Sequence, residues 1–200
     1  MKIDKSIPYM NILMRCDEYR QTPISLPDGF RFRGYKEGDE HVWAGFEIEI
    51  EDFDTYDNAV AYFKRKYLSN PEELKKRLIC VEDKDGTPAG MVIAWFDRSG
   101  ESTISTVHWL VTSPKFQGLG IGRSLVQKLL QTFHELDAYP VYLHTQPWSY
   151  AAIKIYSSLG FKMLRNETIL NYENQYETAI RELAKHLSQE VMDKLISETI

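Results

Sequence analysis

Three glycines at alternate positions, Gly118, Gly120 and Gly122, form the stretch of sequence with the clearest chemical meaning. They follow residues 104–112, an apolar segment typical of a buried strand, and precede a segment with helical periodicity. Glycine leaves the backbone open to a ligand, and the N–H groups and dipole at a helix N-terminus favour an anion. The spacing therefore predicts a loop that binds a phosphate-bearing ligand.

Two other kinds of glycine-rich phosphate loop do not fit this segment. A P-loop has Gly-Lys followed by Ser or Thr, whereas Gly122 precedes Arg123. A dinucleotide-binding loop has GxGxxG spacing, opens a βαβ unit and has an acidic residue roughly 20 positions later. Here the spacing is GxGxG, and more than half of the chain comes first.

The segment VTSPKFQGLGIGRSLV resembles the acyl-CoA-binding motif of the GCN5-related N-acetyltransferase (GNAT) superfamily, Q/R-x-x-G-x-G/A, with Gln117 in the first position. A second family element, A-x-x-x-Y-x-x-x-G-F, is matched by Ala152, Tyr156, Gly160 and Phe161. The two elements together cover residues 104–161. The sequence departs from the family at Ser149, where many members have Asn.

The resemblance implies acetyl-CoA as co-substrate, with its pyrophosphate at the glycine loop. Its pantetheine arm is expected between residues 104–112 and residues 141–145, where a backbone N–H could also polarise the thioester carbonyl. The expected cofactor-binding residues are Leu110, Val111, Thr112, Gln117, Gly118, Leu119, Gly120, Ile121, Gly122, Arg123, Ser149 and Tyr156. A purely structural turn is the alternative.

Tyr156 is the expected acid, because the matching tyrosine of the family points at the coenzyme sulfur. Proton transfer from a tyrosine to a thiolate is uphill by roughly 2 kcal/mol. A hydrogen bond to the departing sulfur is therefore at least as good an interpretation as full protonation. The alternative is a packing residue with its hydroxyl at the surface.

The base is less clear from the sequence. At pH 7 an amine is neutral only about once in 10³ molecules, so a proton must be removed before attack. Strand alternation places Ile104, Thr106, His108 and Leu110 on one face and Val107, Trp109 and Val111 on the other. Many family members carry a carboxylate at the position of Ile104. His108 lies on the same face and is the candidate base; the alternative is a hydrogen-bonded core histidine.

Other polar groups receive weaker assignments. Glu47, Glu49, Glu51 and Asp52 end the first helix and are candidates for binding or deprotonating an amine, although a solvated helix face is the favoured interpretation. His144 is assigned a structural role. No cysteine or serine has an evident nucleophile arrangement, so direct attack in a ternary complex is expected.

The pattern along the chain predicts an α/β fold with a mixed, mostly antiparallel sheet flanked by helices. Strands are expected at residues 10–15 (an edge strand), 30–35, 78–82, 89–96, 104–112, 141–145 and 168–172. Helices are expected from residue 39 to 50, from 55 to 67, after Asn70, after the glycine loop and after Ser149, which is the expected N-cap. The helix after the glycine loop is expected to bury Leu125, Leu129, Phe133 and Leu136, and Arg98-Ser99-Gly100 is expected to turn the chain.

Two segments organise the chain. Residues 1–172 are expected to form the GNAT-like domain and residues 173–200 a C-terminal helical extension packed on it. In the extension Tyr176, Ile180, Leu183, Leu187, Val191 and Leu195 recur at helical spacing. A homodimer contact and a lid over the cleft are the alternatives for these helices.

The chain has the composition of an ordinary globular protein, with 200 residues of which 43% are hydrophobic and 26% charged. A net charge of −5 argues against general nucleic-acid binding. No apolar run is long enough to cross a membrane, and the opening MKID does not begin a signal peptide. Cys16 and Cys80 lack metal-ligand spacing, so no metal and a cytoplasmic location are expected.

The expected function is transfer of an acetyl group from acetyl-CoA to a primary amine of a small molecule or peptide. One alternative is a non-catalytic acyl-CoA-binding or sensing module. Another is a transferase that moves a longer acyl group or uses an alcohol acceptor.

Overall fold

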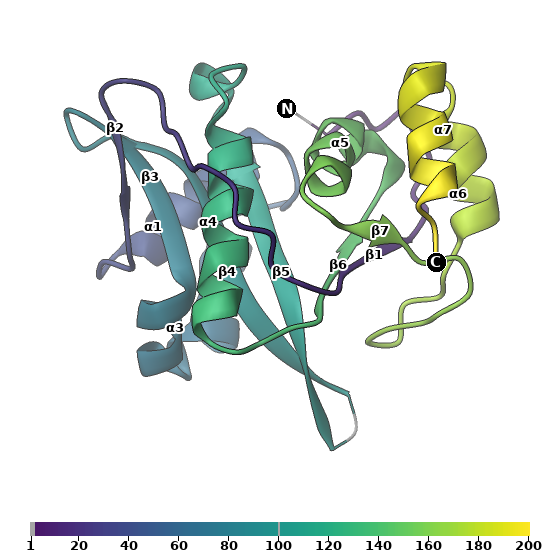
Figure 1. Ribbon diagram of the computed structural model, residues 1–200. Helices are drawn as coiled ribbons and strands as arrows, with labels where there is room; N and C mark the ends of the chain where they lie inside the picture. The colour runs from purple at the N-terminus through teal and green to yellow at the C-terminus, as the bar shows by residue number, and fades with distance from the viewer. Residues whose placement is uncertain (1–2, 100) are drawn as a thin grey trace. The chain divides into compact units, whose positions relative to one another are not determined.

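The structure is a computed structural model that describes residues 3–99 and 101–200 (Figure 1). Its strands are β1 (Ile12–Cys16), β2 (Phe30–Arg33), β3 (Leu78–Asp83), β4 (Pro88–Ser99), β5 (Ser102–Thr112), β6 (Val141–Thr145) and β7 (Lys162–Met163). Hydrogen bonds order them β2-β3-β4-β5-β6-β1-β7. The β1–β6, β1–β7, β2–β3 and β3–β4 pairs are antiparallel, and β5–β6 is parallel. The predicted α/β fold with a mixed, mostly antiparallel sheet is confirmed.

The helices follow the order that the sequence predicts. They are α1 (Asp39–Glu49), α2 (Tyr56–Phe63), α3 (Pro71–Arg77), α4 (Ile121–Glu135), α5 (Tyr150–Ser158), α6 (Tyr176–Leu183) and α7 (Gln189–Ser197). A π-helical turn, η1 (Lys64–Leu68), continues α2, and the 3-10 turns η2 (Pro114–Phe116) and η3 (Pro147–Ser149) precede α4 and α5.

The chain divides into two compact units, which are described separately. Unit 1 contains Thr22–Trp95 and His108–Thr132 together with Ile3, and unit 2 contains Asp4–Gln21, Phe96–Val107 and Phe133–Ile200. Three of the boundaries fall within β4, β5 and α4, and the other two lie between residues 3 and 4 and between residues 21 and 22. The division expected at residue 172 stays a prediction, as does a homodimer.

In unit 1, alternation along β4 separates two layers of helices. Met91, Ile93 and Trp95 face a core cluster that includes residues of α1, α2, η1 and α3. Gly90 faces the opposite side, where an added Cβ would lie 3.1 Å from Leu125 Cδ1 of α4. Figure 1 shows α4 in front of these strands, with α1 and α3 behind them. Both layers are needed because β3 and β4 are buried on both faces.

Strand β5 does not alternate as expected. Trp109 has φ +53°, a left-handed conformation within an extended strand, and Thr106 and Val111 are buried although they are five positions apart. His108 and Trp109 both contact aromatic rings of this core cluster: His108 contacts Tyr67, and Trp109 contacts Trp43. The prediction that they lie on opposite faces is wrong, because one left-handed residue changes which face the following side chains occupy.

In unit 2, β1 is an internal strand. It pairs with β6 on one side and β7 on the other, so the expected edge strand at residues 10–15 is wrong in position. The expected last strand at residues 168–172 is also wrong: Ile169 and Tyr172 form an isolated bridge across a turn in which Leu170 and Asn171 have positive φ. The last strand of the chain is instead β7, which has two residues and pairs with β1.

The C-terminal helices belong to unit 2. Helix α6 contacts β1 and η3, and α7 contacts β7. The backbone of Ile200 pairs with Met163 and Arg165, at 3.0 and 2.8 Å. The buried apolar side chains of α6 and α7 are Tyr176, Ala179, Leu183, Met192 and Leu195, so the predicted stripe is partly confirmed.

Three local predictions need correction. Leu136 follows the last residue of α4 and is only partly buried. Ser149 is the N-cap residue of α5 but makes no side-chain capping bond. Arg98 and Ser99 continue β4, and Gly100 lies outside the described residues.

Within residues 3–99 and 101–200, no helix has the length and apolar character needed to cross a bilayer.

Candidate acyl-CoA site and acceptor-side groups

The glycine loop of unit 1 lies directly before α4. Gly118 and Gly120 have φ +79° and +83°, and a Cβ at either position would meet nothing within 4 Å. Glycine is therefore required for the backbone conformation and not for packing. Leu119 between them is 48% exposed. The first N–H groups of a helix have no partner within the helix, so the loop presents donors at an exposed helix N-terminus.

Side chains around the loop hold it to the rest of unit 1. Gln117 Nε2 donates to the Thr112 carbonyl at 3.0 Å, which ties the loop to the end of β5. Ser124 Oγ donates to the Ser25 carbonyl at 2.7 Å. Gln117 is thus a tether in this structure, and a contact between it and a cofactor stays a prediction. Arg123 is exposed in the first turn of α4.

Leu110, Val111 and Thr112 follow the left-handed residue of β5. A left-handed residue reorients the peptide groups beside it and interrupts a regular ladder. Just after β5, the N–H of Ser113 donates to the Ala89 carbonyl of β4 at 3.0 Å. The left-handed Trp109 thus lies directly before the residues whose backbone is expected to contact the pantetheine arm. Those contacts remain a prediction.

Tyr156 and Ser149 lie in unit 2, at the buried face and the start of α5. Tyr156 is 6% exposed and packs edge-to-face on Phe161, with ring centroids 5.6 Å apart. Burial raises the pKa of its hydroxyl, so this group stays protonated at neutral pH. It can donate a hydrogen bond but is a weaker acid than an exposed tyrosine. Gly160 has φ +101° just after α5, as predicted for a helix C-terminus.

His108 is half-buried in unit 1 and pairs with a tyrosine. Its Nδ1 lies 2.7 Å from the hydroxyl of Tyr67, a fully buried residue of η1. This partner was not identified from the sequence, because η1 is distant in the chain. The contact fixes the imidazole ring and suits either a base or a core histidine, so the catalytic role of His108 stays a prediction.

Glu47 corrects the expectation of a solvated helix face. It is 1% exposed, whereas Glu49 and Glu51 are exposed. Burial, and secondarily the charge of Asp52, raise the pKa of the Glu47 carboxyl well above its usual range. The sequence indicates this burial, because Glu47 follows Trp43 by four positions and therefore lies on the same face of α1.

We expect Glu47→Gln to reduce the pH dependence of stability. A carboxyl whose pKa is higher in the folded state contributes stability below its ordinary pKa of 4.5 and loses it as pH rises toward the folded value. The wild-type protein should therefore lose stability between pH 5 and pH 8 from this group, and the variant should not. Thermal unfolding at both pH values should show a difference of at least about 2–4 °C, or about 1 kcal/mol. Glu49→Gln is the control; parallel profiles for all three proteins would contradict the prediction.

His144 of unit 2 fits its predicted structural role. Its Nε2 lies 2.7 Å from Asn11 Oδ1, and its ring stacks on Tyr172 with centroids 3.8 Å apart. Burial lowers its pKa to about 4. The ring is therefore neutral at pH 7 and holds strand β6 against neighbouring segments of its own unit.

Neither cysteine resembles an activated nucleophile. Cys16 and Cys80 are buried free thiols, and burial raises their pKa values to about 11 and about 12. A reactive thiol needs a lowered pKa. The described residues also contain no group of three or more His, Cys, Asp or Glu side chains able to hold a metal ion.

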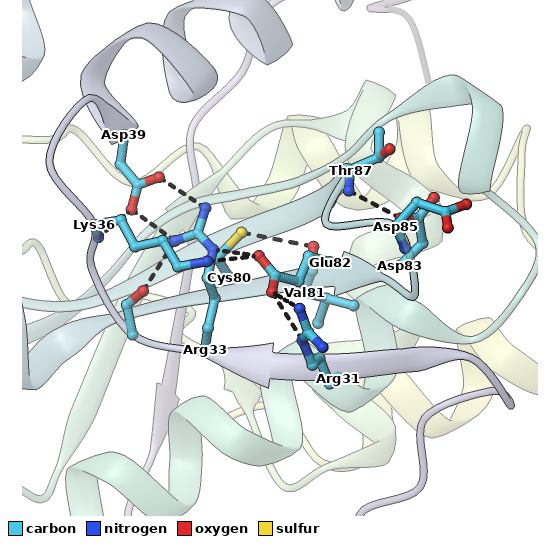
Figure 2. A network of polar contacts seen from close by, with 11 residues as sticks. Arg31, Arg33, Lys36, Asp39, Cys80, Val81, Glu82, Asp83, Asp85 and Thr87 are labelled. Carbon is cyan, nitrogen blue, oxygen red and sulfur yellow. Dashed lines mark hydrogen bonds and ion pairs between the residues drawn. The ribbon is translucent and has the colours of Figure 1, made fainter.

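An ion-pair network fixes the start of α1 to β2 and β3 (Figure 2). Arg33 donates to both oxygens of Asp39 at 2.8 Å and to Glu82 Oε2 at 2.9 Å. Hydrogen bonds from Arg31 and Lys36, and then from Arg33, lower the pKa of Glu82 to about 2. Both carboxylates are buried and fully bonded, so this network is structural. It sets the direction of α1, which carries Trp43 and Glu47.

The predicted site residues thus fall into two groups. Unit 1 holds His108, the end of β5 and the loop from Gln117 to Arg123, and the Gln117–Thr112 bond joins the last two. Unit 2 holds Ser149 and Tyr156.

Two known proteins are similar in sequence to part of this chain. Serotonin N-acetyltransferase 2 of Oryza sativa subsp. japonica is 28% identical over 87 residues, covering 43% of this chain and 42% of that protein. Mycothiol acetyltransferase of Acidothermus cellulolyticus is 24% identical over 169 residues, covering 70% of this chain and 47% of that protein. The chain therefore spans less than half the length of these two relatives.

A solved structure shares the fold. A Clostridium acetobutylicum protein, described as a predicted acetyltransferase with acetyl-CoA, superposes with a TM-score of 0.55 and 15% identity, over 71% of this chain and 96% of that chain. The model of the acetyltransferase (GNAT) family matches residues 35–161, more than half of the sequence, and includes both the glycine loop and Tyr156. The chain belongs to the acetyltransferase (GNAT) family.

Proposed function

We propose that the protein is an N-acetyltransferase that moves the acetyl group of acetyl-CoA to a primary amine by direct attack in a ternary complex. The observation that carries the proposal is the exposed loop before α4, where Gly118 and Gly120 adopt left-handed conformations at the family's acyl-CoA motif. Backbone N–H groups there would bind the pyrophosphate.

The relatives support the two substrates named here. The Clostridium acetobutylicum structure is described with acetyl-CoA, and the rice and Acidothermus relatives are named as a serotonin N-acetyltransferase and a mycothiol acetyltransferase. The absence of an activated thiol among the described cysteines supports direct attack over a covalent acyl-enzyme. Two buried free thiols are also consistent with the proposed cytoplasmic location.

In the proposed reaction, each group of residues has a separate role. The peptide groups that follow Trp109 would bind the pantetheine amides, and one N–H would polarise the thioester carbonyl. Tyr156 would donate a hydrogen bond to the departing sulfur, a role that its raised pKa supports over complete proton transfer. His108, oriented by Tyr67, would receive the proton from the amine.

Two measurements test the function. Calorimetric titration should show saturable binding of acetyl-CoA, and a panel of primary amines should include at least one that causes thiol release from it. No binding at millimolar acetyl-CoA would remove the basis of the proposal. Binding without turnover of any amine would favour the alternative of an acyl-CoA-binding module, which the lack of a carboxylate at Ile104 supports. Competition by longer acyl-CoA molecules would test acyl-chain preference.

Tyr156→Phe is expected to lower kcat by about 10- to 100-fold, the effect of losing one hydrogen bond to a charged atom. The Kd for acetyl-CoA should change little, because the loop in unit 1 is unaltered. Steady-state kinetics and calorimetry measure the two quantities. Tyr150→Phe, at the start of the same helix, is the control. Equal kcat values for the two variants would contradict a role for the Tyr156 hydroxyl.

A further inference from the structure

Helix α1 carries an unusual line of unsatisfied polar atoms. Among residues 3–99 and 101–200, four buried side-chain polar atoms lack a hydrogen-bond partner: Glu40 Oε2, Trp43 Nε1, Glu47 Oε1 and Glu47 Oε2. All four belong to α1, at positions i, i+3 and i+7, which lie on one face of a helix. Unsatisfied buried groups are rare in native proteins, and four on one helical face point to a ligand.

Glu47 is the most demanding member of this line. Glu47 is 1% exposed, and the one charged side chain of the described residues that contributes to its raised pKa, after burial, is the acidic Asp52. The loop after α1 brings Asp52 back to the helix, since its N–H donates to the Glu47 carbonyl at 2.9 Å. Asp52 is exposed and adds negative charge near Glu47, and neither Glu47 carboxyl oxygen has a hydrogen-bond partner among the described residues. An ionised carboxylate in such a position needs a cation.

Three partly exposed aromatic rings of unit 1 pack on Trp43, which lies one turn before Glu47. Phe53, Tyr62 and Trp109 contact Trp43 with ring centroids 5.4, 5.8 and 5.3 Å away. They also contact one another, at 5.5 to 5.7 Å. Trp43 is fully buried, whereas the other three are partly exposed. Aromatic faces attract cations and bury apolar groups, and the Arg65 guanidinium already lies 5.7 Å above the Tyr62 ring.

We propose that Glu47, assisted by Asp52, binds the ammonium group of the acceptor, and that the acceptor is a primary amine carried on an aromatic or apolar group. The ammonium supplies the donors and the charge that Glu47 lacks, and the partly exposed rings of Phe53, Tyr62 and Trp109 contact the apolar part. This inference rests on the proposed function and specifies its acceptor. All of its residues lie in unit 1. The raised pKa of Glu47 agrees with a carboxyl that ionises fully only when a cation pairs with it.

The probes for the test are 2-phenylethylamine and 2-phenylethanol, which have the same ring but differ in charge. Each is titrated into the full chain, alone and with coenzyme A, and binding is measured by calorimetry. We expect the amine to bind at least about 10-fold more tightly than the alcohol, as for one charge-assisted hydrogen bond. Glu47→Gln should remove this preference, and Asp52→Asn should reduce it.

Glu49→Gln is the matched control, because Glu49 is exposed on the same helix. It should bind the amine as the wild type does. Unfolding profiles of each variant establish that it is folded, and Glu47→Gln keeps the shape of the side chain. Three results would overturn the inference: unchanged amine binding by Glu47→Gln, equal binding of amine and alcohol, or no binding of either probe at millimolar concentration.

Activity measurements separate this inference from the proposed function. If the wild type acetylates amines and Glu47→Gln does so with unchanged KM and kcat, the inference fails and the function stands. If the amine binds through Glu47 but no amine is acetylated, the transferase function fails and the amine site stands. If both hold, Glu47→Gln should raise KM for the amine by at least about 10-fold with an unchanged Kd for acetyl-CoA.

Discussion

Gly120→Glu is expected to weaken acetyl-CoA binding by more than about 100-fold. The substitution adds a side chain and a negative charge at the exposed turn before α4, where the proposed function has the pyrophosphate. Two like charges about 4 Å apart repel by about 1 kcal/mol in water and about 4 kcal/mol near a protein surface, and a pyrophosphate carries more than one charge. The side chain also occupies the position of the ligand. Calorimetric titration with acetyl-CoA measures the effect.

Backbone strain must be separated from the effect of charge, since Gly120 has φ +83°. Gly120→Ala adds only the backbone strain, and Gly120→Gln adds the bulk of the side chain without the charge. The affinity for acetyl-CoA should therefore decrease in the order Gly120→Ala, Gly120→Gln, Gly120→Glu. Gly86→Glu is a matched control: Gly86 also has φ +83°, meets nothing within 4 Å and lies in the turn between β3 and β4. It should bind as the wild type does. A folded Gly120→Glu protein with wild-type affinity would show that this loop does not hold the pyrophosphate.

The loop was predictable because its signal is local. Glycines between a strand and a helix determine a turn that needs positive φ, and the structure has that turn at Gly118 and Gly120. The break in β5 was not predictable in this way. Trp109 is a bulky residue that rarely adopts positive φ, and packing of its ring on Trp43 accompanies that conformation here. Alternation therefore placed His108 and Trp109 on opposite faces, although both contact one cluster.

The positions of Glu47 and His108 also depend partly on local sequence and partly on distant segments of the chain. The helical period puts Glu47 on the face of Trp43, but its burial depends on the loop that returns at Asp52, where Glu51 has φ +66°. The partner of His108 lies 41 positions away at Tyr67. Likewise, β1 becomes an internal strand only because β7, two residues long, pairs with its second edge. Such pairings come from the assembled unit and not from the period of any one segment.

Arg33→Ala is expected to destabilise the protein by about 3–5 kcal/mol, the cost of leaving buried charges unpaired. The Arg33 side chain is 10% exposed, and its removal leaves Asp39, at 2% exposure, without its guanidinium partner (Figure 2). Glu82 would keep Arg31 and Lys36, so the loss should be concentrated at the first turn of α1. Urea unfolding measures the free energy.

Arg31→Ala is the control for this prediction, because Arg31 lies on the same strand and also pairs with Glu82 but is 64% exposed. An exposed ion pair contributes about 0–1 kcal/mol, so its loss should be small. Equal costs for the two variants would contradict the view that burial determines the contribution of Arg33.

The pH dependence of this network has the opposite sign to that of Glu47. The network lowers the pKa of Glu82, so the stabilisation from Glu82 is present above pH 4.5 and is lost as pH falls toward about 2. The network at the start of α1 is thus strongest at neutral pH. At that pH the unpaired Glu47, eight positions after Asp39, costs stability, and an acceptor cation would remove that cost.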